Sequence, residues 1–138
     1  MAQPFLISID PKADLPPSEQ LVQQICFAVA AGSLSEGERL PSVRTLAVDA
    51  SVNPNTVGKA WRDLERMGVL DSRPGDGVFV ARGALRLARA ARDQWMSATL
   101  SRWIDDAKRS GLTRGEIERC VALALVKRRD WNQLGESA

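Results

Sequence analysis

A very short connection between two helical segments constrains this chain more than any other feature. Ser42 can cap a short helix in which apolar side chains recur at helical spacing over residues 43–47. A second helix opens at Asn53, a capping residue, followed by Pro54 at the first helical position. Only residues 50–52 lie between the end of the first helix and this cap. We therefore expect two helices joined by a tight turn.

The segments on either side extend this unit to a recognisable order. Apolar spacing predicts a first helix over about residues 17–31, and two short apolar runs around a Pro/Gly turn predict a β-hairpin over residues 69–81. Helix, helix, tight turn, helix and hairpin is the order of a winged helix-turn-helix, so we expect a mainly α fold with a small β-hairpin wing in residues 1–82. Residues 5–9 are expected to add a short edge strand or extended arm.

The chain changes character after Gly83. Residues 84–110 contain no proline or glycine and predict a long helix, and Thr113 with Glu116 forms a capping box for a final one. These two helices have only each other and a second copy to pack against, so residues 83–138 are expected to be a two-helix dimerisation region with a two-fold interface. The side chains expected at that interface are Trp95, Leu100, Trp103, Ile104, Ile117, Val121 and Leu125.

The composition argues against an enzyme. The chain has no histidine and no tyrosine, which removes the commonest general base, the commonest metal ligand and a phenolic acid. Its two cysteines, Cys26 and Cys120, sit among apolar residues and are expected to be small buried side chains of a reduced protein, with redox sensing as the alternative. We therefore predict no catalytic, metal or cofactor site.

No segment suggests a membrane location. The longest apolar run, residues 25–31, is far shorter than the roughly 18 to 20 residues that span a bilayer. The N-terminus has neither a basic stretch nor the apolar centre of a signal peptide. We expect a cytoplasmic protein.

The second helix of the pair carries the candidate binding residues. In a helix-turn-helix the outward face near the start of this helix enters the major groove of DNA. Lysine and hydroxyl groups hold phosphates, and asparagine can read adenine through two hydrogen bonds. The outward residues here are Asn55, Thr56, Lys59 and Arg62.

Further candidates flank this helix. Arg39, Ser42 and Arg44 surround the start of the short helix, where a phosphate can bind, and Arg44 is the best candidate for a guanine contact. In the hairpin, Arg73 and the tip at residues 75–77 could approach a minor groove or a phosphate. Each of these residues also has an ordinary structural explanation, since exposed cations are usually solvated and Gly-Asp-Gly is a common turn.

The charge distribution gives only modest support for a nucleic-acid site. The whole chain has a formal charge of +2, and residues 1–83 contain eight Lys or Arg against ten Asp or Glu. Residues 39–73 contain six against four, so basic charge gathers around the helix pair. We expect weak non-specific DNA affinity and a small salt dependence. A winged helix that binds protein instead of DNA stays open as the alternative.

The motifs of this half of the chain resemble the GntR family of bacterial transcription regulators, over about residues 4–82, and the short helical tail is similar to its YtrA subfamily. The residues that carry the resemblance are Pro17-Ser18-Glu19-Gln20-Leu21, Gly32 to Ala47, Val52-Asn53-Pro54-Asn55-Thr56-Val57, Leu64 to Leu70, and Gly75-Asp76-Gly77-Val78-Phe79-Val80. The resemblance implies a homodimeric repressor of a palindromic operator near its own gene, often beside transport genes.

The resemblance also implies which residues contact DNA. The positions where family members meet DNA are Arg39, Ser42, Arg44, Asn53, Asn55, Thr56 and Gly77, while Lys59 and Arg62 follow from helical geometry alone. One departure is Gly58, where many relatives carry a larger side chain; glycine weakens the helix by roughly 1 kcal/mol relative to alanine. If a small-molecule effector acts on this chain, we expect it to change the angle at Gly83, the flexible joint between reader and tail.

Overall fold

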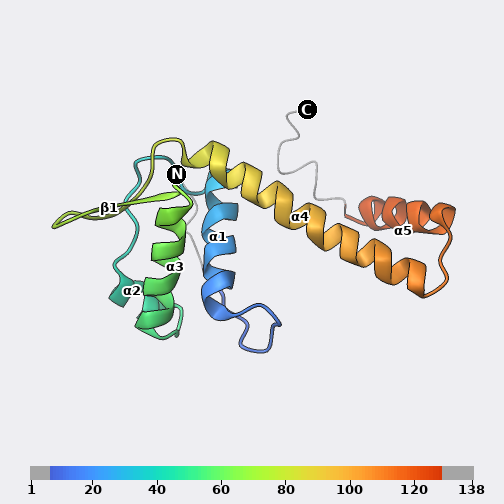
Figure 1. The fold of residues 1–138 in the computed structure, drawn as a ribbon, viewed down its shortest axis with the longest axis horizontal. Coiled ribbons are helices and arrows are strands. Elements are labelled where there is room, and N and C mark those ends of the chain that lie inside the picture. Colours follow the sequence, from blue (N-terminus) through green and yellow to red (C-terminus); the bar gives the residue numbers. More distant parts are fainter. Residues whose placement is uncertain (1–6, 129–138) are drawn as a thin grey trace. The chain divides into compact units, whose positions relative to one another are not determined.

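The structure, a computed structural model, describes residues 7–128, which form five helices and one two-stranded antiparallel sheet. The elements are α1 (Pro17–Ala31), α2 (Val43–Asp49), α3 (Pro54–Arg66), β1 (Leu70–Arg73), β2 (Gly77–Val80), α4 (Ala84–Arg109) and α5 (Arg114–Val126), shown in Figure 1. The expected mainly α fold with a hairpin wing is confirmed. The chain divides into two compact units, one ending at Trp95 and one beginning at Met96.

The core of the first unit lies between α1 and α3, which run side by side in Figure 1. Leu21 and Ile25 of α1 and Val57 and Leu64 of α3 are fully buried there. Ala47 of α2 is also buried, and its small side chain lets α3 cross close by. Only residues 50–53 separate the end of α2 from the start of α3, so the predicted tight turn is present.

Side-chain caps fix the ends of both helices of the pair. The Ser42 hydroxyl accepts a hydrogen bond from the Thr45 backbone N–H at 3.1 Å. The side-chain Oδ1 of Asn53 accepts one from the Asn55 N–H at 2.8 Å, and Pro54 is the first helical residue. These bonds satisfy donors that a helix start leaves free, which is why the sequence located both starts correctly.

The wing contains a third extended segment that the sequence did not predict. The Leu40 N–H donates to the Val78 carbonyl and the Val80 N–H donates to the Glu38 carbonyl, both at 2.8 Å, and Arg39 pairs with Phe79. Gly37 and Pro41 are typical of a loop, and the run between them is too short to show the alternation of a strand. The consequence is that β2 is paired on both edges.

The N-terminal arm runs back along α1 and does not form a strand. Residues 5–6 of the expected strand lie outside the described residues, and residues 7–9 have no strand pairing. The Ser8 N–H donates to Gln24 Oε1 at 3.0 Å and Gln24 Nε2 donates to the Ser8 carbonyl at 2.6 Å. Gln20 makes the same two bonds with Asp10, both at 2.9 Å. A glutamine side-chain amide has the same donor and acceptor as a peptide group. Gln20 and Gln24 therefore make the hydrogen bonds to the arm that a neighbouring strand would otherwise make.

Apolar spacing over residues 17–31 predicts that Gln20 lies largely away from the apolar face, and the structure corrects this. Gln20 is buried, and its Nε2 also donates to the Leu15 carbonyl at 2.7 Å. Burial is tolerated because its polar atoms are hydrogen-bonded.

The start of α4 belongs to the core of the first unit. Ala84 and Ala88 are each 0% exposed, and Trp95 meets Phe27 of α1 edge-to-face with ring centroids 5.9 Å apart. A change of angle at Gly83 would pull both alanines out of this core. The packing of Ala84 and Ala88 gives the expected flexible joint at Gly83 no support, and an effector that acts there stays a prediction.

The two cysteines differ in their surroundings. Cys26 is buried in α1, as expected, and burial raises the pKa of its thiol to about 12. Cys120 is exposed on α5, so the expectation that it is buried is wrong for the single chain. Val121, next to it in the sequence, is exposed as well, whereas Ile117 is buried.

Candidate nucleic-acid interface

The helix α3 has one buried and one exposed side, as the candidate site requires. Ala60 and Trp61 face the core with Val57 and Leu64. The predicted contact residues Asn55, Lys59 and Arg62 are exposed, and Thr56 is half-buried. The exposed side of α3 therefore carries an amide and two cations within its first nine residues.

The residues before α2 lie in the open as well. Arg39, Ser42 and Arg44 are exposed. The Ser42 hydroxyl is occupied, since it accepts from the Thr45 N–H and donates to Thr45 Oγ1 at 2.9 Å. The hydroxyl that is predicted to contact DNA therefore also caps α2. Asn53 is in a similar position, but its capping bond uses the carbonyl oxygen and leaves the amide N–H groups as donors.

The positively charged residues among the predicted contacts differ in whether they form an ion pair within the chain. Within residues 7–128, no carboxylate lies within ion-pair distance of Arg39, Arg44, Lys59 or Arg62. Arg73 differs, because its Nε lies 3.5 Å from Asp71 Oδ2. The four unpaired cations keep their charge available for an external anion such as a phosphate.

Arg62 and Arg39 each rest against a glycine. A Cβ at Gly58 would lie 3.5 Å from a guanidinium nitrogen of Arg62, one turn later on α3. A Cβ at Gly77 would lie 3.0 Å from Arg39 Nε and 3.2 Å from Arg39 Nη2. The structure thus brings together Arg39 and Gly77, two predicted contact residues that are far apart in the sequence.

The arm lies beside the start of α3, which the sequence did not indicate. Ile9, Pro11 and Pro17 line a hollow of about 470 Å³ together with residues of the helix turn and of α3, among them Asn53 and Thr56. Phe79 was also missed: the guanidinium carbon of Arg73 lies 4.3 Å from the centroid of its ring. Alternation in Val78-Phe79-Val80 is a signal that could have placed Phe79 on the outer face of the wing.

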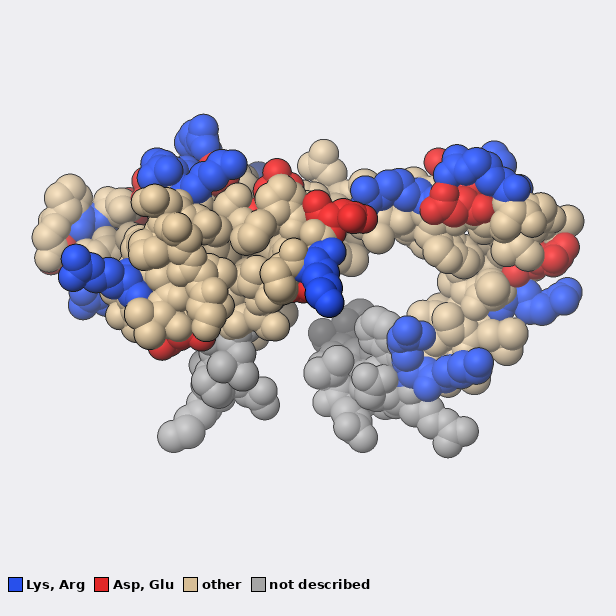
Figure 2. All heavy atoms as spheres, turned by 90° about the horizontal axis from the view of Figure 1, so that it is seen from below, with Lys and Arg blue, Asp and Glu red and all other residues tan. Residues whose placement is uncertain are grey.

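The charges do not form one continuous basic surface on the face drawn in Figure 2. Lys and Arg side chains stand there in small groups separated by uncharged and acidic residues. This agrees with the balanced charge of the sequence. Binding to DNA would therefore depend on particular side chains more than on a strong overall field.

The second unit exposes apolar side chains along α4 and α5. Leu100 is 51% exposed and Leu125 is 53% exposed, and with Trp103, Cys120 and Val121 they line a groove of about 430 Å³. These four predicted dimerisation residues, Leu100, Trp103, Val121 and Leu125, thus share one surface.

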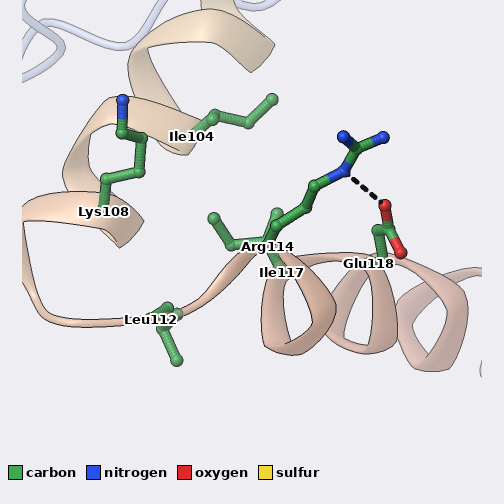
Figure 3. A pocket seen from close by; sticks show the side chains of 6 residues that line it. All are labelled: Ile104, Lys108, Leu112, Arg114, Ile117 and Glu118. Atoms are coloured by element: carbon green, nitrogen blue, oxygen red, sulfur yellow. Dashed lines mark hydrogen bonds and ion pairs between the residues drawn. The ribbon is translucent and has the colours of Figure 1, made fainter.

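The other predicted dimerisation residues have neighbours within the chain. Ile117 is buried and Ile104 half-buried where α4 turns into α5, and both line the pocket of about 510 Å³ in Figure 3. In that view Arg114 Nε donates to Glu118 Oε1 at 2.9 Å on the rim of the pocket. Trp95 belongs to the first unit, where it packs on Phe27.

The described part of the chain has neither a cluster of metal ligands nor a membrane-spanning helix. No group of three or more His, Cys, Asp or Glu in residues 7–128 could hold a metal ion. No helix in this range is long and apolar enough to cross a membrane.

The fold and the polar exposed side of α3 define a winged helix-turn-helix protein. Residues 17–80 match the protein family described as "Bacterial regulatory proteins, gntR family". The chain is 35% identical over 107 residues to the HTH-type transcriptional repressor YtrA of Bacillus subtilis, covering 78% of this chain and 82% of that protein. This chain belongs to the GntR family of bacterial regulatory proteins.

Two solved structures extend the comparison. A transcriptional regulator from Oenococcus oeni is 33% identical and superposes with a TM-score of 0.68, covering 85% of this chain and 97% of that one. AraR(DBD), solved in complex with operator ORX1, is 28% identical with a TM-score of 0.51, covering 57% of this chain and all of that one. The proteins that this chain resembles are thus transcription regulators, among them a DNA-binding domain on its operator.

Proposed function

We propose that this protein is a dimeric transcription repressor that binds a palindromic operator near its own gene in the bacterial cytoplasm. The observation that carries the proposal is the set of unpaired, exposed cations on and around α3: Arg39, Arg44, Lys59 and Arg62. The similarity to AraR(DBD) on its operator and to the repressor YtrA supports the same reading. In this proposal α3 enters the major groove, and the wing contacts the adjacent backbone or minor groove.

The tail would supply the second copy. One winged helix reads only a few base pairs, and specificity of 10³-fold or more usually needs two modules. The exposed groove of Leu100, Trp103, Val121 and Leu125 offers an apolar surface for a two-fold contact. Burying these side chains against a second copy removes their apolar area from water, which is the main driving force for association.

The proposal is tested by fluorescence anisotropy with a labelled duplex from the region upstream of the gene. Arg44→Ala should weaken binding by about 1–3 kcal/mol, because it removes a direct base or phosphate contact. Arg109→Ala is the matched control: it removes the same charge from the second unit, where Arg109 pairs with Asp106 on the surface. Equal affinity of both variants and wild type would mean that Arg44 makes no contact with DNA. No binding at low salt would favour a protein-binding module.

A further inference from the structure

The outer face of the wing collects two arginines, one aromatic ring and one carboxylate. Phe79 of β2 stands opposite Asp71 of β1 on one side and Arg39 on the other. Directly opposite residues share a face of a sheet. Leu70 and Val80 are also paired and both are buried in the core, so the face of Phe79 is the one turned away from it.

The ring of Phe79 holds Arg73 in place. The guanidinium carbon of Arg73 lies 4.3 Å from the ring centroid, within the range of a cation–π contact. Asp71 Oδ2, at 3.5 Å from Arg73 Nε, is a long and weak second partner, and both side chains are 53% exposed. The Phe79 ring is thus the main contact that holds Arg73 on the wing. It leaves the N–H groups at the edge of the guanidinium free to donate.

Arg39 is on the extended segment beside β2, and its side chain lies on the same face of the wing. Its guanidinium covers Gly77, whose missing side chain leaves the space it occupies. Gly77 and Phe79 are two positions apart on β2, which corresponds to roughly 7 Å of strand. Both guanidinium groups therefore lie on this face of the wing, that of Arg39 over Gly77 and that of Arg73 over the Phe79 ring.

We propose that Phe79 is a positioning residue for DNA binding: it holds the Arg73 guanidinium beside that of Arg39, so that the two form a prearranged clamp for the phosphate backbone. The inference rests on the proposed function. An arginine that is already placed loses less conformational freedom when it binds a phosphate. The contact between Asp71 and Arg73 is long and solvent-exposed, so a backbone phosphate, which also offers two anionic oxygens, can take its place on the guanidinium.

The test is a double-mutant cycle measured by anisotropy over a range of salt concentrations, with the upstream duplex and a random-sequence duplex. Arg73→Ala should weaken binding to both duplexes and lower the salt slope by about one, as the loss of one phosphate contact does. Phe79→Leu should weaken binding roughly two- to fivefold, because the ring contact is lost while the charge stays. In the Arg73→Ala background, Phe79→Leu should have no further effect. Phe79→Tyr keeps the ring face and should bind like wild type.

The outcomes separate this inference from the proposed function. If wild type binds neither duplex at low salt, the proposed function fails and the inference fails with it. If wild type binds but Phe79→Leu weakens binding equally with and without Arg73, Phe79 acts only through the stability of the wing and the inference is wrong. Thermal melting of each variant shows whether it is folded, and Phe79→Met replaces Phe79→Leu in the cycle if the leucine variant is not.

Discussion

At the scale of single residues, Cys26 makes stability depend on pH in the alkaline range. Burial raises the pKa of its thiol from 9.0 to about 12, so between these values the unfolded chain releases a proton that the native chain retains. The free energy of unfolding attributable to this thiol therefore stays constant below pH 9 and falls as the pH rises toward 12.

Urea unfolding of wild type and Cys26→Ala across this range checks the prediction. The stability advantage of wild type over Cys26→Ala should shrink steadily above pH 9, since alanine cannot ionise. A constant difference between the two proteins up to pH 11 would show that the native thiol titrates normally.

Gly77 ties backbone geometry to a binding residue. Its φ of 118° is costly for other residues, and a Cβ there would push on the Arg39 guanidinium. Gly77→Ala should therefore destabilise the wing by about 1–2 kcal/mol and also weaken DNA binding through the displaced Arg39.

Gly75→Ala is the matched control, because Gly75 has a φ of 83° but open space around its Cβ position. Thermal melting and anisotropy on both variants separate the two effects. Equal losses of DNA affinity in the two variants would mean that the contact with Arg39 has no part in binding.

At the scale of elements, the first three turns of α4 stabilise the winged unit. Trp95 packs edge-to-face on Phe27 with an interplanar angle of 82°, and such pairs contribute about 0.5–1.5 kcal/mol beyond their buried area. Trp95→Leu should lower the free energy of unfolding by about 1–2 kcal/mol, and Trp95→Phe by less. Urea titration measures both, and no difference between them would deny the ring contact a role.

The elements also show which parts of this fold a sequence can predict. Caps at Ser42 and Asn53 and a stop at Gly32 are local signals, so helix boundaries followed from residues next to them. The extended segment at Arg39 and the arm held by Gln20 and Gln24 depend on partners far away along the chain. No local pattern predicts such partners, because these residues come together only when the chain folds.

The candidate site likewise has one part that the sequence could predict and one part that it could not. The exposed face of α3 was predictable, since helical spacing separates Lys59 and Arg62 from the buried side chains. The support of Arg73 by Phe79 and of Arg39 by Gly77 was not, because both pairs meet across the wing.

At the scale of the whole molecule, Cys120 reports on the proposed dimer. It is exposed in the single chain and lines the groove of Leu100, Trp103 and Val121. If this groove binds a second copy, alkylation of Cys120 should be slow at high protein concentration and faster on dilution. Cys26 is an internal control that should stay unreactive in the native protein at both concentrations, since it is buried.

A charge in the groove provides the complementary test. Leu100→Asp should shift the protein to monomers in light scattering, because a dimer would bury an unpaired carboxylate. Met96, equally exposed on the same helix but outside the lining of this groove, gives the control Met96→Asp. Dimers of unchanged stability in Leu100→Asp would place the interface elsewhere.

The measurement that tests the account most directly is a hydroxyl-radical footprint of the protein on DNA from upstream of its gene, with the mass of the complex determined on the same sample. A dimer on a palindromic operator should give two chains per site and two protected half-sites on one face of the duplex, about 10 base pairs apart or a multiple of that spacing. Arg44→Ala should lose both protections. A single protected half-site with one chain bound, or no protection at low salt, would contradict it.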